Sequence, residues 1–244
     1  MRRSPKPPPV RDEHLARQSP HKGHGMNLPT EIFGDVIVIH APEEVGEEQA
    51  DAFEDFTTSQ ERSKVVLDLD GSGQYQVETP IGFLTHMVEQ LAKHGLFDLE
   101  VRAVGDTHID GHHTTEDLAI ALGQAFATAL GDKVGIRRFG SATLPMDEAC
   151  VTCALDLSGR PYFVWAVTLP KAKLGDFDTE LAEVFFEGFA RGSQCNLHMR
   201  QHAGENLHHV IEISFKAFAR SLREATEIDP RVVGVPSTKG TLTE

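Results

Sequence analysis

The sequence predicts an α+β fold built from two copies of one β-β-α-β-α unit. The motif HHxxE occurs twice, beginning at His112 and at His208, which lie 96 residues apart. Each copy opens a segment whose apolar residues recur at helical spacing. The other predicted elements of the two halves also match at offsets of 96 to 98 residues. A repeat of this length indicates an internal duplication, and we expect two antiparallel sheets with helices packed between them.

In the first half, a run that begins at Lys64 alternates apolar and polar residues up to a Gly71-Ser72-Gly73 turn. A second strand follows over residues 74–79, so the pattern predicts a hairpin. We expect the remaining elements to be a helix over residues 82–94 that Gly95 ends, a strand over 97–104, a polar loop over 105–111 and a helix from His112 that ends at Gly131.

The second half repeats this order. Residues 142–156 alternate as in a strand, Ser158-Gly159 makes a turn, and residues 161–169 read as the returning strand. We expect a helix over 178–191, capped by Asp178 or Thr179. The predicted strand over 195–202, the loop over 204–206 and the helix over 208–225 then complete the unit.

The N-terminal region has a different character. Residues 1–25 are rich in proline and basic residues, which is typical of a disordered tail, and Met26 is an alternative start to Met1. Residues 35–40 predict a short strand, and the acidic run over 43–54 a solvated helix or a linker. We therefore expect a variable extension over residues 1–55 and a duplicated domain over 56–244, with halves over 56–132 and 133–230 and a C-terminal segment over 231–244.

Composition excludes several classes of protein. The formal net charge of −14 argues against a general nucleic-acid binder, and no apolar run approaches the ~20 residues of a membrane span. The three cysteines indicate a reducing, cytoplasmic setting. Two of them form Cys150-x-x-Cys153, which we interpret as strand residues rather than a redox or zinc motif, because no second CxxC is present.

The HHxxE motif is suited to metal binding. In a helix the first histidine and the glutamate stand on one face, and the second histidine points about 100° away. One helix can thus offer an imidazole and a carboxylate to one metal and its other imidazole to a second. Imidazole and carboxylate together suit divalent Mn, Fe or Zn. One isolated copy is usually a solvated helix face, but two copies in matching contexts favour metal sites.

A set of further motifs, in order along residues 57–243, resembles the imidazoleglycerol-phosphate dehydratase family. The motifs are GDTHIDGHHTTED (105–117), GIRRFG (135–140), PMDE (145–148), DLSGRP (156–161), GDFDTE (175–180), HHVIE (208–212), FKA (215–217) and PSTKG (236–240). The resemblance implies a fold like domain 2 of ribosomal protein S5. It also implies a hydro-lyase of histidine biosynthesis, which converts D-erythro-imidazole glycerol phosphate to imidazole acetol phosphate.

The same resemblance implies two Mn2+ ions per active site, a metal-bound imidazolate during the reaction, and an assembly of twenty-four identical subunits that share their sites. By position, one metal would be bound by His86, His113, His208 and Glu212, and the other by His112, Glu116, His198 and His209. Arg138, Arg160, Ser237 and Lys239 match the residues that bind the substrate phosphate. We interpret His94, His108 and His202 as surface residues.

This chain departs from the family pattern at three positions. Gln60 aligns with the family's acid/base glutamate, and Glu61 is one residue away from that position; Thr85 and Gly111 stand where the family has aspartates beside metal-binding histidines. Two alternatives follow. One is an active dehydratase in which Glu61 or another residue supplies the base. The other is a divergent paralogue that keeps the metal and phosphate sites but has lost or changed catalysis. A metal-dependent hydrolase on an unrelated fold and a purely structural metal assembly are disfavoured by the ordered motifs and the phosphate residues.

Overall fold

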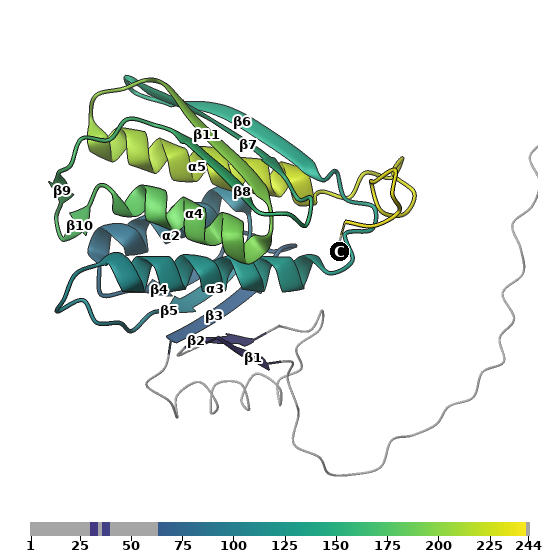
Figure 1. The fold of residues 1–244 in the computed structure, drawn as a ribbon, viewed down its shortest axis with the longest axis horizontal. Coiled ribbons are helices and arrows are strands. Elements are labelled where there is room, and N and C mark those ends of the chain that lie inside the picture. The colour runs from purple at the N-terminus through teal and green to yellow at the C-terminus, as the bar shows by residue number, and fades with distance from the viewer. Residues whose placement is uncertain (1–29, 34–35, 40–62, 243–244) are drawn as a thin grey trace, which may run out of the picture.

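A computed structural model of the protein describes residues 30–33, 36–39 and 63–242. Two β-sheets enclose a layer of helices (Figure 1), as the sequence predicts. The described helices are α2 (Gly82–Gly95), α3 (His112–Leu130), α4 (Leu181–Ser193) and α5 (Leu207–Thr226). Within this layer α3 packs against α4, and α2 against α5. Each helix pair therefore contains one helix from each half of the duplication.

The two sheets repeat one arrangement of strands. One sheet has the order β1 (Thr30–Phe33), β2 (Val36–Ile39), β3 (Ser63–Asp68), β5 (Asp98–Arg102) and β4 (Tyr75–Glu78). The other has the order β6 (Phe139–Met146), β7 (Ala149–Asp156), β11 (Asn196–Ala203) and β8 (Tyr162–Ala166), and β9 (Lys173–Leu174) pairs with β10 (Phe177–Asp178) nearby. β5 pairs antiparallel with β3 and parallel with β4, and β11 likewise pairs antiparallel with β7 and parallel with β8. This shared pattern is the structural form of the duplication.

The predicted hairpin between residues 64–70 and 74–79 is wrong, because β5 lies between β3 and β4. The turn is held open by Asp98 on β5, whose Oδ1 accepts hydrogen bonds from the backbone N–H of Ser72 and of Gln74, both at 2.8 Å. A Cβ on Gly71 would lie 2.3 Å from the Asp98 nitrogen, so a glycine is required at this close approach. In the second half β8 likewise pairs with β11 and not with β7.

The single alternating stretch over residues 142–156 is in fact two strands, β6 and β7, joined by a tight turn. Asp147 adopts a φ of 48° in this turn, a conformation that aspartate tolerates better than most residues. The sequence lacks a glycine here, which is why the turn was missed. The predicted helix cap is also wrong: Glu180 precedes α4 without a side-chain cap, while the Thr179 hydroxyl donates to the Pro170 carbonyl.

The predicted short strand over residues 35–40 is confirmed as β2, so part of the extension belongs to the first sheet. β2 runs parallel to β3, whereas β6, at the corresponding edge of the other sheet, runs antiparallel to β7. A tight turn enforces an antiparallel pair, and a longer connection permits a parallel one. The acidic run over residues 43–54, Gln60 and Glu61 lie outside the described residues.

Phenylalanine rings fill the core between the helices and the second sheet. Phe186 of α4 is fully buried, with ring centroids 4.7 Å from Phe215 and 5.3 Å from Phe218 of α5. Trp165 of β8 stacks on the same ring at 5.5 Å. These contacts join α4, α5 and the sheet into one unit, and so fix the position of α5, which carries the second HHxxE motif.

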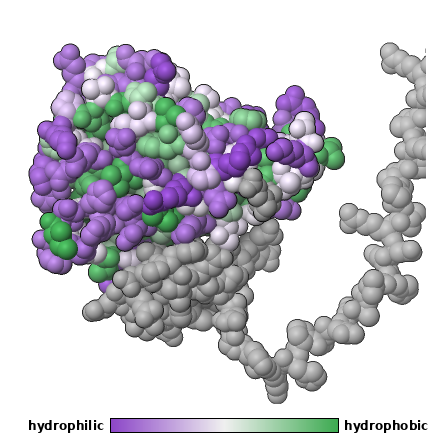
Figure 2. All heavy atoms as spheres, viewed as in Figure 1, coloured by the Kyte–Doolittle hydropathy of each residue, from purple (hydrophilic) through white to green (hydrophobic). Residues whose placement is uncertain are grey.

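Hydrophilic side chains cover most of the face in Figure 2, with hydrophobic residues in separate patches among them. Some large hydrophobic side chains are nevertheless exposed, among them Ile109 in the loop between β5 and α3, at 63%, and Val233 after α5, at 95%. Among the described residues, no helix combines the length and the apolar character needed to cross a bilayer.

Candidate functional site

Three of the predicted metal ligands converge between α2 and α5. One ligand atom each from His86, His208 and Glu212 lies within 4.8 Å of the others. Oε2 of Glu212 is 2.9 Å from Nε2 of His208 and 3.6 Å from Nε2 of His86. Two imidazoles and a carboxylate are a donor set that binds borderline divalent metals. The residues present therefore fit such an ion.

The start of α5 is fixed by a side-chain cap. Asn206 Oδ1 accepts from the backbone N–H of His208 at 3.0 Å and of His209 at 3.5 Å. Glu212 stands one turn further on and is only 6% exposed. Burial is the largest single influence on its carboxyl and would raise the pKa. The ammonium of Lys216, 2.6 Å from Oε1, together with His208 and His86, outweighs burial, so the net pKa is lowered. Glu212 is thus an anion ready to bind a cation.

The residues of the first HHxxE motif do not converge on one point as His86, His208 and Glu212 do. His112 and His113 are exposed at the start of α3, and the His112 N–H donates to Asp110 at 2.8 Å. Glu116 accepts a hydrogen bond from Arg191 of α4 at 2.6 Å. The His113 ring contacts Asp106 in the loop before the helix, with 2.9 Å between Nδ1 and Oδ2.

His209 also binds a carboxylate. Its Nδ1 lies 2.8 Å from Oε2 of Glu148, in the turn between β6 and β7. This hydrogen bond lowers the pKa of Glu148 to about 2 and raises the pKa of His209 above its ordinary value. His198, on β11, is exposed and stacks on Tyr162 with 6.2 Å between the ring centroids. Across the described residues, His112, His113, Glu116, His198 and His209 belong to no group like that of His86.

Thr85 and Gly111, at the positions of the two missing aspartates, take part in local packing instead. The Thr85 hydroxyl lies 2.9 Å from that of Thr79 and closes the turn before α2. A Cβ on Gly111 would lie 2.9 Å from the Cδ1 atoms of both Ile81 and Leu181, so apolar side chains occupy that space.

The histidines without a predicted role differ in their exposure. His108 is exposed, as is His202, whose Nε2 lies 2.6 Å from the hydroxyl of Thr152. The surface interpretation is wrong for His94, which is half-buried. Burial lowers the pKa of His94, and the positive charges of Lys216 and Arg220 lower it further.

The four predicted phosphate residues do lie together. Arg138, Arg160, Ser237 and Lys239 all line one open hollow of about 480 Å³ formed by the C-terminal segment and the ends of the second sheet. Phosphate is bound by cationic side chains and oriented hydroxyl or N–H donors, and this lining offers both.

Arg138 is held in place by the protein itself. Its Nε and Nη2 donate to the two carboxylate oxygens of Asp156 at 2.7 and 3.0 Å, and Nη1 donates to the Pro236 carbonyl at 2.8 Å. Arg137 faces elsewhere and pairs with Glu224 and Glu227. Asp156 was not recognised from the sequence, although it opens the DLSGRP motif.

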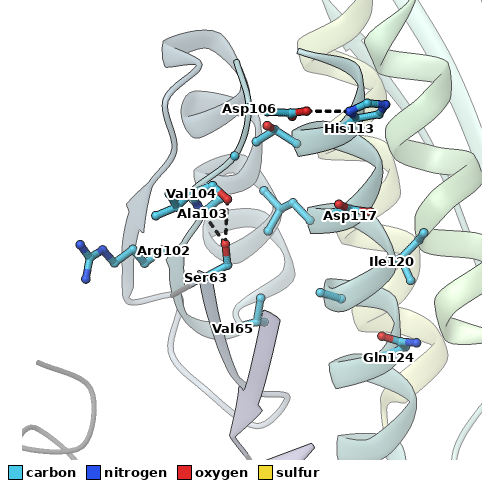
Figure 3. Close-up of a pocket in the computed structure, with 14 residues that line it drawn as sticks. Ser63, Val65, Arg102, Ala103, Val104, Asp106, His113, Asp117, Ile120 and Gln124 are labelled. Carbon is cyan, nitrogen blue, oxygen red and sulfur yellow. Dashed lines mark hydrogen bonds and ion pairs between the residues drawn. The ribbon is translucent and has the colours of Figure 1, made fainter. Parts of the chain in front are cut away.

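The larger hollow, of about 520 Å³, lies elsewhere, between β3, β5 and α3. Figure 3 shows its lining, with Asp106 and His113 hydrogen-bonded at one end and Gln124 on α3 toward the other. His113 is the only predicted ligand among its lining residues, so this hollow is not where the predicted site gathers.

The cysteines behave as strand and core residues. Cys150 and Cys153 lie on β7, three positions apart, so their side chains point to opposite faces of the sheet. All three cysteines are free. Burial raises the pKa of Cys153 to about 12 and that of Cys195 to about 11, so neither forms a thiolate readily.

Comparison with known proteins gives consistent matches. The sequence profile described as imidazoleglycerol-phosphate dehydratase matches residues 79–222. The enzyme of that name from Gluconacetobacter diazotrophicus is 56% identical over 186 residues, covering 76% of this chain and 94% of the relative. That from Jannaschia sp. is 55% identical over 186 residues, covering 76% and 95%. The crystal structure of the Staphylococcus aureus enzyme superposes with a TM-score of 0.65 at 35% identity, over 70% of this chain and 96% of that one.

Proposed function

This chain belongs to the imidazoleglycerol-phosphate dehydratase family of hydro-lyases in histidine biosynthesis, and on that premise we propose the reaction it performs. The substrate is D-erythro-imidazole glycerol phosphate, and the products are imidazole acetol phosphate and water. The observation that carries the proposal is the convergence of His86, His208 and Glu212 on one point between α2 and α5. Two imidazoles and a buried carboxylate can hold a divalent metal ion, and such an ion could assist the dehydration of an imidazole substrate.

The metal ligands would be those that the sequence indicates. His86, His113, His208 and Glu212 would hold one Mn(II) ion, and His112, Glu116, His198 and His209 would hold a second. When bound, the two ions would supply Lewis acidity to the imidazole ring of the substrate.

The chain's own residues bind and orient the substrate. The phosphate dianion would be held by Arg160, Ser237 and Lys239, with the two guanidinium N–H groups of Arg138 that Asp156 and Pro236 leave unused. Holding the phosphate fixes the distance between the glycerol carbons and the metal ligands, because the chain between phosphate and ring is short.

Proton transfer needs an acid/base group near the glycerol carbons. Glu61 is our proposed base, because Gln60, at the position of the family glutamate, cannot take up a proton at neutral pH. Both residues lie outside the described part of the chain, and the profile match begins after them, at residue 79. The presence of Gln60, Thr85 and Gly111 is what favours the second candidate, a paralogue that binds metal and ligand but has lost or changed catalysis.

We further propose a homo-oligomer of twenty-four subunits whose sites are shared, in the reducing cytoplasm where free cysteines persist. Two features support shared sites. In the part of the chain that the structure describes, the proposed ligands of the second metal form no cluster, and a second subunit could complete the site. Large hydrophobic side chains, such as Ile109 beside the first HHxxE motif and Val233 near the phosphate hollow, are also exposed. Sedimentation should then give a particle much larger than a dimer, and a monomer would contradict shared sites.

The test is turnover of the phosphorylated substrate by the purified, Mn(II)-loaded protein and by its Gln60→Glu variant. Activity of the parent supports the dehydratase, and its loss in Glu61→Gln would identify Glu61 as the base. A silent parent that Gln60→Glu restores supports the divergent paralogue. If parent and variant both bind Mn(II) and both are silent, the proposed reaction is wrong.

A further inference from the structure

The second histidine of each HHxxE motif is hydrogen-bonded to a carboxylate from outside its helix. His113 contacts Asp106 and His209 contacts Glu148, in both cases through Nδ1, at 2.9 and 2.8 Å. We propose that Asp106 and Glu148 are positioning residues, which hold these rings so that Nε2 points to a divalent cation. This inference rests on the proposed function, since it takes both histidines to be metal ligands, and it assigns a role to two residues that sequence reasoning left without one.

The choice of ring atom decides the geometry. A carboxylate can only accept, so each contact requires the proton on Nδ1. A neutral imidazole with its proton on Nδ1 has its lone pair on Nε2, the atom that would bind a metal. Carboxylates that accept from the remote N–H of a ligating histidine fix its tautomer and orientation and raise its basicity. Both contacts therefore prepare the same ring atom of two different histidines.

Glu148 is itself tied to the start of α5. Its Oε1 accepts from the backbone N–H of Asn206 at 2.9 Å, while Oε2 holds His209. Asn206 is in turn the cap of α5. One carboxylate thus links the β6–β7 turn, the helix start and the imidazole, and this leaves the ring little freedom to swing away.

Asp106 performs the corresponding task from a different place in the chain. It lies in the loop between β5 and α3, and Figure 3 shows its carboxylate directed at the ring of His113. Its backbone carbonyl also accepts from the N–H of Ile109 at 2.8 Å, which folds the loop toward the helix. The two carboxylates are not related by the duplication: one precedes its histidine by 7 residues and the other by 61. Carboxylates at two unrelated positions accept from the same ring atom, Nδ1, of the second histidine of each motif. Random pairing of charged side chains on the surface does not explain this agreement.

Thr85 and Gly111, which precede His86 and His112, carry no carboxylate. Thr85 closes the turn before α2, and apolar side chains fill the space at Gly111. Asp106 and Glu148 remain as carboxylates that reach two of the histidines.

The experiment measures Mn(II) affinity by electron paramagnetic resonance of the free ion, using the full-length protein. We expect Glu148→Ala and Asp106→Ala to weaken binding about 10- to 100-fold. Glu148→Gln and Asp106→Asn should lose much less, because an amide oxygen still accepts from Nδ1–H. Glu205→Ala is the matched control, since Glu205 is an exposed carboxylate in the loop next to Asn206, and it should bind Mn(II) as the parent does.

A second readout separates positioning from structural damage. With positioning, the Mn(II) concentration for half-maximal activity rises in both alanine variants, and kcat at saturating Mn(II) stays within a few-fold of the parent. The Tm of the metal-free protein stays unchanged in Asp106→Ala, and in Glu148→Ala it falls only by the small amount expected for the lost hydrogen bond to the Asn206 N–H. Unaltered Mn(II) affinity in both alanine variants would overturn the inference and leave the proposed function intact. The inference would also be overturned if each variant lost Mn(II) affinity only in proportion to its loss of metal-free Tm. A parent that binds no Mn(II) would instead contradict the proposed function.

Discussion

Replacing Arg138 by lysine tests what holds together the hollow that Arg138, Arg160, Ser237 and Lys239 line. The guanidinium makes two hydrogen bonds to Asp156 and one to the Pro236 carbonyl. A lysine keeps the charge, but its single ammonium on a flexible stem cannot reproduce the planar fork that spans both partners. We therefore expect Arg138→Lys to retain one bond to Asp156 and to lose the other two.

The size of the effect follows from burial. The side chains of Arg138 and Asp156 are only 16% and 17% exposed, so water screens their interaction weakly. Hydrogen bonds to charged groups contribute about 1.5–3 kcal/mol each. Since two of the three bonds are lost, the free energy of unfolding should fall by about 3–6 kcal/mol. Loss of the bond to Pro236 also releases the segment that carries Ser237 and Lys239, and KM should rise about 10-fold, which corresponds to ~1.4 kcal/mol.

The assays are urea unfolding of the metal-free protein and steady-state kinetics with the phosphorylated substrate. Phosphate binding is made in both ground state and transition state, so KM should change more than kcat. Arg137→Lys is the control, because Arg137 pairs with Glu224 and Glu227 on the surface and should change stability by less than about 0.5 kcal/mol. If the Arg138→Lys variant had the stability and KM of the parent, the hydrogen bonds of the Arg138 guanidinium would not be what orders the segment that carries Ser237 and Lys239.

Three further outcomes are expected. Phe186→Ala should lower the free energy of unfolding by about 3–5 kcal/mol, measured in urea, because it empties the centre of the aromatic cluster; a loss below about 1 kcal/mol would mean that the core refills the space. Burial holds the pKa of His94 below the ordinary 6.5, so His94 stays neutral in the folded protein while the unfolded chain takes up a proton. Stability should therefore fall as pH drops below about 6.5, and His94→Gln should flatten that part of the profile of Tm against pH relative to the parent. Finally, a thiol reagent at neutral pH should label Cys150 in the native protein and reach Cys153 and Cys195 only after unfolding; rapid native labelling of all three would contradict their burial.

Local patterns predicted the helices and their order well. The helix periodicities around His112 and His208 are carried by residues close in sequence, and the structure begins α3 and α5 within a residue of those positions. The hairpins failed for a reason that local pattern does not contain. Whether the strand after Gly73 pairs with β3 or with β5 depends on Asp98, which comes 25 residues later. Strand pairing depends on residues far apart in the sequence, whereas helix formation depends on residues within a few positions of one another.

The same distinction between local and non-local information applies to the predicted site residues. Motifs in the sequence predict Arg138, Arg160, Ser237 and Lys239 as phosphate-binding residues, and the fold brings all four to one hollow. The roles of Asp106 and Glu148 were missed, although both stand inside motifs that were noted, because a carboxylate's partner is decided by how the chain folds back. His94 was misjudged for a similar reason, since its burial comes from the packing of α2 against α5.

The sequence alone thus determined the duplication, the α+β class, the family and the residue types available for metal and phosphate, because repetition and motif spacing are properties of the linear chain. Tertiary structure decided the strand order, the convergence of His86 with His208 and Glu212, and the carboxylates that contact His113 and His209. Apart from the Asp106–His113 contact, which spans 7 residues, those features depend on contacts between residues tens to more than a hundred positions apart. Such contacts exist only once the hydrophobic core has fixed the helices and sheets relative to one another.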